Sequence, residues 1–153
     1  KDAGVENICE FQVMDAENLK FGDDTFDLIC GSGILHHLDL ESSYSEIRRC
    51  LKPGGKAVFF EPLGHNPVIN VYRNLTPKMR TDDEHPLLLK DLKMAEDYFG
   101  KVEAKYFNLT ATAATFLPPL AGTLHGIDRA LFKIMPYFRR HAWIVVLTFS
   151  EPK

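Results

Sequence analysis

The first 62 residues of this chain contain three short, mostly apolar runs, and a glycine or a polar residue follows each of them. Residues 11–14, 26–30 and 57–60 have the length and composition of buried β-strands. The residues that follow these runs are Asp15, Gly31 and Glu61. Open α/β sheets bind ligands outside the C-terminal ends of their strands. We therefore predict a binding site built from these three positions.

Helical spacing of apolar residues separates the later strands. Residues 40–51 place Leu40, Tyr44, Ile47 and Leu51 on one face. Asp39 offers an oxygen that can cap the start of this helix, and residues 53–55, Pro-Gly-Gly, are expected to stop it. Further helices are predicted over 67–75, 88–99 and around 124–134, and further strands over 102–109 and 142–149. This alternation predicts one α/β domain, with a parallel sheet covered by helices on both faces.

Composition narrows the class of protein. The chain has 153 residues, is 45% hydrophobic and 25% charged, and carries a net charge of −3. These values fit one globular domain, and they give no electrostatic basis for binding nucleic acid. No apolar run approaches the length of a membrane span, and the first residues do not resemble a secretory signal. Three cysteines without CxxC spacing predict neither a disulfide framework nor a metal site, so a cytoplasmic location is expected.

Several motifs recur at fixed spacing between residues 15 and 55. They are Asp15-Ala16, Phe26-Asp27, Leu35-His36-His37-Leu38, Arg49, and Leu51-Lys52-Pro53-Gly54-Gly55. As a set they resemble the class I S-adenosylmethionine-dependent methyltransferases, in the subgroup that acts on small molecules and quinones. The resemblance is specific for about residues 10–62, and residues 142–149 look like the family's last, antiparallel strand. It implies a Rossmann-like, mostly parallel sheet with that strand reversed, and an enzyme that transfers methyl groups.

The resemblance also implies a cofactor site for S-adenosylmethionine. Asp15 would accept a hydrogen bond from the adenine amino group, and the backbone N–H of Ala16 would donate to a ring nitrogen. The backbone carbonyls of Cys30 and Gly31 would face the amino group of the methionine moiety. Each residue also has a simpler interpretation, since Asp15 is typical of a turn and the two others of a bend between strand and helix.

Acid–base chemistry is expected from His36 or His37. An imidazole titrates near neutral pH and can take a proton from a hydroxyl group of a small-molecule acceptor. Relatives that look like this chain often pair a histidine here with a carboxylate at the end of the next strand, which is Glu61. The alternative is that one histidine packs against the helix start, the other is solvated, and Glu61 merely ends a strand.

Residues 63–141 are expected to form the acceptor side of the site, between a cofactor side over 1–62 and the last strand over 142–153. The polar stretch 63–86 is a natural lid, although Asp82 to Glu84 would also suit an exposed turn. The apolar residues between 116 and 138 stand among arginines and a lysine. They suit an acceptor pocket, a membrane surface, core packing or self-association.

The motifs of the family's first half are missing. Its sheet order is 3-2-1-4-5-7-6, and a glycine-rich turn follows strand 1, but no such turn precedes residue 15 here. We expect the first two strands of the family to be absent. Their absence leaves unpaired strand edges, which can pair with another chain. The chain is then a fragment of a longer polypeptide, a collapsed sheet, or a domain completed by a partner. Alone it should bind S-adenosylmethionine weakly or not at all, and low or no activity is expected. The competing function is a cofactor-free binding or scaffolding module.

Overall fold

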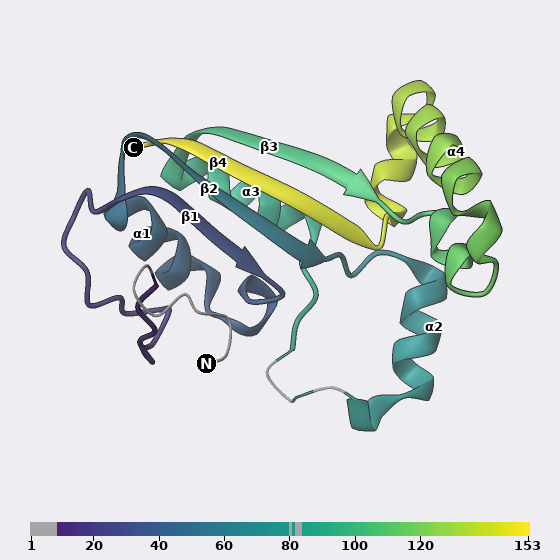
Figure 1. The fold of residues 1–153 in the computed structure, drawn as a ribbon, viewed down its shortest axis with the longest axis horizontal. Helices are drawn as coiled ribbons and strands as arrows, with labels where there is room; N and C mark the ends of the chain where they lie inside the picture. Colours follow the sequence, from purple (N-terminus) through teal and green to yellow (C-terminus); the bar gives the residue numbers. More distant parts are fainter. Residues whose placement is uncertain (1–8, 80, 82–83) are drawn as a thin grey trace.

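A four-stranded sheet forms the centre of the structure (Figure 1). The computed structural model describes residues 9–79, 81 and 84–153. The strands are β1 (Phe26–Ser32), β2 (Leu51–Pro62), β3 (Phe99–Phe107) and β4 (Ile144–Pro152), in the spatial order β1-β2-β4-β3. β1 and β2 are parallel, and β4 runs antiparallel to both β2 and β3. Three strands therefore point the same way and the last is reversed, which confirms the predicted fold class.

Four α-helices accompany the sheet: α1 (Leu40–Cys50), α2 (Pro67–Leu75), α3 (Leu89–Tyr98) and α4 (Ala121–Ile134). Asp39 caps α1 as predicted, because its carboxylate accepts a hydrogen bond of 2.9 Å from the backbone N–H of Ser42. Hydrogen bonds from Ser42 also hold the pKa of Asp39 below its usual value. The Pro-Gly-Gly turn differs from the prediction, since α1 ends at Cys50 and residues 53–55 lie within β2, where the pairing with β1 is irregular and Gly54 has φ +83°.

Helices cover only one face of the sheet in the part of the chain that the structure describes, so the prediction of two covered faces is wrong. α1 and α3 pack against the buried side chains of β2 and β4, which are Ala57, Phe59, Val145, Leu147 and Phe149. On the opposite face Leu28 is 60% exposed and Phe60 is 46% exposed. The helices that connect consecutive strands explain the difference. α1 lies between β1 and β2 in the sequence, α3 lies between β2 and β3, and both pack on the same face.

The first predicted strand is also absent. Residues 11–14 have no regular secondary structure, and the side chains of Phe11 and Val13 are exposed to solvent. A strand is stabilised by the backbone of its neighbour, and no described segment lies in a ladder beside residues 11–14. Residues 11–14 therefore have the composition of a strand, but no described segment pairs with them. Nor does this segment pair with the free edge of β1, so within the described residues the sheet is not closed by collapse.

α2 and α4 lie beyond the C-terminal ends of β1 and β2 (Figure 1). α4 is anchored there by Asp128, whose buried carboxylate accepts hydrogen bonds from the backbone N–H groups of Leu109, Thr110 and Ala111. Of the predicted lid, Arg80, Asp82 and Asp83 lie outside the described residues. Within the described part of the chain, none of the helices has both the length and the apolar character needed to cross a bilayer.

Candidate functional site

A buried carboxylate joins the C-terminal ends of β1 and β2. Side chains alternate along β2, so Glu61 points to the same covered face as Phe59 and is fully buried. Its Oε2 lies 2.8 Å from Nδ1 of His36. Its Oε1 accepts hydrogen bonds of 3.0 Å from the backbone N–H groups of Ile34 and Leu35. Glu61 therefore fixes the segment after β1, including the 3-10 turn Leu35–His37.

The contact with Glu61 determines which nitrogen of His36 is available for chemistry. A carboxylate oxygen accepts hydrogen bonds, so the ring donates through Nδ1 and Nε2 is left as the proton acceptor. The ring is 8% exposed and packs against the ring of His37, with 4.1 Å between the ring centroids. His36 and Glu61 are thus brought together as expected, in the arrangement by which a carboxylate orients a general base.

His37 lies on the more open side of the same turn. It borders a surface hollow of about 330 Å³ together with Asp39, Glu41, His85 and Asp91. The backbone N–H of His85 donates to the carbonyl of His36 at 2.8 Å, which links the end of the 63–86 segment to the 3-10 turn. The two histidines therefore differ in setting, with His36 fixed in the interior and His37 at a surface opening. Among the described residues no group of three or more potential ligands could hold a metal ion.

A second hollow, of about 320 Å³, lies at the C-terminal end of β1. It is bordered by three of the four residues expected to bind the cofactor, Ala16, Cys30 and Gly31. The remaining lining is mostly apolar and comes from β1, the segments before and after it, α1 and β2: Leu19, Ile29, Ser32, Ile34, Leu35, Leu38, Ser43, Ile47 and Phe59. Segments distant in sequence thus converge on one concave surface at the strand ends.

Glycine is required at position 31 by packing. A Cβ atom built there would lie 2.7 Å from the ring of Phe59 and 2.8 Å from the side chain of Ile34, which is closer than real Cβ contacts. The side chains of Phe59 and Ile34 therefore occupy the space that a side chain at position 31 would need. Since Gly31 has no side chain, its backbone borders the second hollow.

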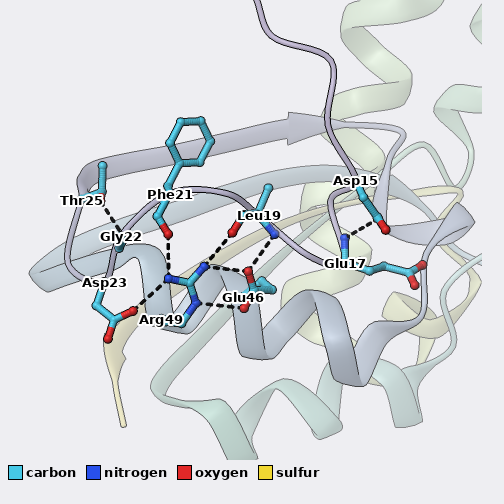
Figure 2. Close-up of polar contacts among 9 residues, drawn as sticks. All are labelled: Asp15, Glu17, Leu19, Phe21, Gly22, Asp23, Thr25, Glu46 and Arg49. Carbon is cyan, nitrogen blue, oxygen red and sulfur yellow. Dashed lines mark hydrogen bonds and ion pairs between the residues drawn. The ribbon is translucent and has the colours of Figure 1, made fainter.

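Asp15 lies beside this hollow without lining it. It is exposed, and its Oδ1 accepts a hydrogen bond of 2.9 Å from the backbone N–H of Glu17 (Figure 2). This contact closes a turn at Asp15, and it leaves Oδ2 without a hydrogen bond inside the described part of the chain. The structure thus brings Ala16, Cys30 and Gly31 together and places Asp15 at their margin.

Arg49 holds the segment that carries Ala16 against α1 (Figure 2). Its guanidinium donates to the backbone carbonyls of Leu19 at 2.9 Å and Phe21 at 2.7 Å. It also donates to the carboxylates of Asp23 at 2.8 Å and of Glu46 at 2.9 and 2.7 Å. We call Arg49 and Glu46 the α1 clamp. A planar guanidinium with five donors suits such a set of fixed acceptors.

Glu46 completes the clamp from the neighbouring turn of α1. Its Oε2 accepts a hydrogen bond of 2.8 Å from the backbone N–H of Leu19, so both backbone groups of Leu19 are held. The hydrogen bonds from Arg49 hold the pKa of the Glu46 carboxyl below its usual range, and those to Glu46 and Asp23 raise the pKa of Arg49. At the other end of α1, the capping residue Asp39 donates its backbone N–H to the carboxylate of Glu17 at 2.8 Å.

Replacing Arg49 by alanine should lower the free energy of unfolding, because the variant removes the hydrogen bonds to the carbonyls of Leu19 and Phe21 and the ion pair with Glu46. Urea unfolding followed by circular dichroism measures the change. Arg48→Ala is the matched control, since Arg48 is the adjacent arginine and, among the described residues, donates to the terminal carbonyl of Lys153 alone. Equal losses in the two variants would contradict a clamp specific to Arg49.

The α1 clamp is the part of the site that the sequence-based interpretation missed. Arg49 belonged to the recognised motif, but no role was predicted for it. Its acceptors Leu19 and Phe21 offer backbone carbonyls, which any residue type would supply. The signal that was available is the pair Glu46 and Arg49, three residues apart on one helix face.

Comparisons of the sequence identify a family model and several relatives. Residues 1–59 match the family model of the methyltransferase domain. The ubiquinone/menaquinone biosynthesis C-methyltransferase UbiE of Idiomarina loihiensis is 30% identical over 109 residues, which cover 63% of this chain and 43% of that protein. The chain thus spans less than half the length of this relative.

Solved structures share the fold. A methyltransferase of Archaeoglobus fulgidus described as SAM dependent superposes with a TM-score of 0.62 at 15% identity, covering 95% of this chain and 69% of that one. Phosphoethanolamine N-methyltransferase 2 of Haemonchus contortus, solved in complex with S-adenosyl-L-methionine, gives a TM-score of 0.56 at 17% identity and covers 91% and 36%. At these identities the likeness concerns the fold.

Proposed function

We propose that this chain, a member of the class I S-adenosylmethionine-dependent methyltransferases, contributes the C-terminal part of an enzyme that methylates a small molecule. The family match over residues 1–59 and the shared fold support the reaction class. The relative from Idiomarina loihiensis is a quinone C-methyltransferase by name. A quinol is therefore the first acceptor to test.

The observation that carries the proposal is the hollow at the C-terminal end of β1. Ala16, Cys30 and Gly31 border it together, although Ala16 precedes β1 and the two others lie within it. Ligands in open α/β folds bind at this position of the sheet. The mostly apolar lining with exposed backbone at Gly31 suits a planar heteroaromatic ring next to polar groups.

S-adenosylmethionine supplies a methyl group that is already activated on a sulfonium. The fit of this cofactor rests on the donors and acceptors that the hollow offers. The N–H of Ala16 would bind a ring nitrogen of the adenine, and Asp15 would use Oδ2 for its amino group. The carbonyls of Cys30 and Gly31 would accept hydrogen bonds from the methionine amino group. The α1 clamp would keep the first of these segments in place.

His36 is the proposed general base toward a hydroxyl of the acceptor. Its Nδ1 donates to Glu61, so Nε2 is the atom that would receive the proton. Glu61 acts as a positioning residue, since it orients the ring and stabilises the imidazolium that forms. His37, at the surface opening, is the second candidate for the base. Positioning of the acceptor supplies much of the rate in such a displacement, and the base adds to it.

Cofactor binding tests the proposal through Asp15. Calorimetry with S-adenosylmethionine should show weak binding or none for the 153-residue chain, and clear binding for a polypeptide that also carries any residues encoded in frame before Lys1. In that longer polypeptide, Asp15→Ala should weaken binding by about 1–3 kcal/mol, the usual loss when a hydrogen bond to a charged group is removed.

Two controls separate a cofactor contact from a turn. Asp27→Ala removes an exposed aspartate of β1 and should leave the affinity unchanged. Asp15→Asn retains an oxygen that can close the turn on Glu17. If Asp15→Ala lowers the melting temperature but not the affinity, Asp15 is a turn residue. Absence of cofactor binding by the longer polypeptide would favour a cofactor-free module.

A further inference from the structure

One side of α4 presents an apolar stripe to solvent. Leu120, Ile127 and Ile134 are spaced by seven residues, which is close to two helical turns, so they share one side of the helix. Their side chains are 46%, 43% and 76% exposed. The inward side of α4 is supplied by Asp128 and Phe132, which are buried. The apolar stripe and the buried side of α4 are therefore different sides of the helix.

The segments on either side of α4 extend this stripe. Phe116 and Leu117 precede the helix and are 83% and 51% exposed. Met135 and Tyr137 follow it and are 48% and 65% exposed. Core packing, one of the interpretations of this region, therefore holds for Phe132 and not for these residues. We call these seven exposed residues the α4 surface: Phe116, Leu117, Leu120, Ile127, Ile134, Met135 and Tyr137.

Positive charge accompanies the α4 surface. Residues 110–141 contain Arg129, Lys133, Arg139 and Arg140, and Asp128 is their one acidic residue. The carboxylate of Asp128 is buried and is held by backbone N–H groups. This segment therefore carries a net charge of +3, whereas the rest of the chain carries −6, since the whole chain carries −3. Arg140 also lies over the ring of Tyr137, 5.4 Å from its centroid.

We propose that the α4 surface docks on a membrane whose headgroups are anionic. A helix with an outward apolar stripe and flanking cations can lie in the bilayer interface, where the apolar side chains enter the acyl boundary. Lys133 lies about 100° around the helix from Ile134, so it flanks the stripe and would then meet anionic lipid, which attracts such a charge near the surface. Aromatic residues such as Phe116 and Tyr137 favour the same interface.

Charge distinguishes a membrane from a second copy of this chain. A symmetric dimer through the α4 surface would bring the same cations of residues 129–140 close to one another, and like charges across an interface oppose association. The acidic remainder of the chain would be repelled by the same membrane, which fixes the orientation with α4 toward the lipid. α4 lies beyond the C-terminal ends of β1 and β2, so this orientation turns the end of the sheet that carries Glu61 toward the bilayer (Figure 1).

Vesicle co-sedimentation tests the docking with the 153-residue chain. The chain should bind vesicles of phosphatidylcholine mixed with phosphatidylglycerol, bind pure phosphatidylcholine much less, and be released by salt. Lys133→Gln should weaken binding to the mixed vesicles by about fivefold, given the attraction of one cation to anionic lipid. Ile127→Gln with Ile134→Gln should weaken it by at least about tenfold, because two apolar side chains leave the interface.

The matched control is Val71→Gln with Leu75→Gln on α2, where the two side chains are 60% and 76% exposed. This variant should bind the mixed vesicles as the original chain does, and circular dichroism should show that all variants fold. The proposal is overturned if the original chain does not bind the mixed vesicles, or if the α2 variant loses as much binding as the α4 variants. It is also overturned if sedimentation velocity shows a dimer that Ile127→Gln with Ile134→Gln dissociates.

Discussion

Replacing Glu61 by alanine should lower the free energy of unfolding by about 3–5 kcal/mol, the usual cost of removing one partner from a buried charged network. The variant leaves the backbone N–H groups of Ile34 and Leu35 without their acceptor, and it does the same to Nδ1 of His36. Each buried donor left without an acceptor adds to the loss. Guanidinium unfolding at neutral pH, followed by circular dichroism, measures the change.

Two further variants define what Glu61 contributes. Glu61→Gln keeps one acceptor oxygen and should therefore be less destabilising than alanine. Glu103→Ala removes an exposed glutamate of β3 that is 3.4 Å from Lys101, and such surface pairs contribute little to stability. A loss below about 1 kcal/mol in Glu61→Ala would show that the carboxylate does not organise the end of β1.

His36→Ala should lower the turnover of the active methyltransferase by about a hundredfold with a quinol as the acceptor, the lower end of what a general base contributes. The reason is that Nε2 of His36 is the proposed proton acceptor and Glu61 holds the ring through Nδ1. Initial rates of the variant and of the unchanged enzyme measure the loss.

The comparison of histidines decides which one acts. His37→Ala should have a smaller effect on turnover than His36→Ala, because Glu61 holds the ring of His36, whereas His37 borders the separate surface hollow. His125→Ala, on the exposed side of α4, should leave turnover unchanged. If neither His36→Ala nor His37→Ala lowers the rate, positioning alone carries the reaction. Loss of cofactor affinity in one of them would place that histidine in the cofactor site.

The local parts of this fold could be predicted from the sequence. α1 was expected from helical spacing and from the cap at Asp39, and these signals operate within a few residues. The prediction of a strand over residues 11–14 was wrong, because a strand depends on a distant partner that its own pattern does not specify. On α4 the spacing predicted a helix over Leu124 to Ile134 and gave no information on which side packs, so Ile127 and Ile134 are exposed while Phe132 is buried.

The candidate site was predictable to a similar extent. The positions of Gly31 and Glu61 at strand ends followed from the pattern of apolar runs, and the family resemblance added His36. Arg49 could not be assigned a role, because it binds carbonyls of Leu19 and Phe21 that are 30 and 28 residues away. Backbone acceptors leave no mark in a sequence. Their contribution becomes visible only when the chain is folded.

The α1 clamp has a consequence for which changes of chain length this domain can accept over evolution. Glu46 and Arg49 reach the same segment because they stand one turn apart on α1. One residue inserted between them would rotate Arg49 by about 100° around the helix axis and carry it away from Leu19. Extra residues placed after Asp23, before β1 begins, would leave both contacts intact. Insertions and deletions should therefore be excluded from one turn of α1 and tolerated in the loop beside it.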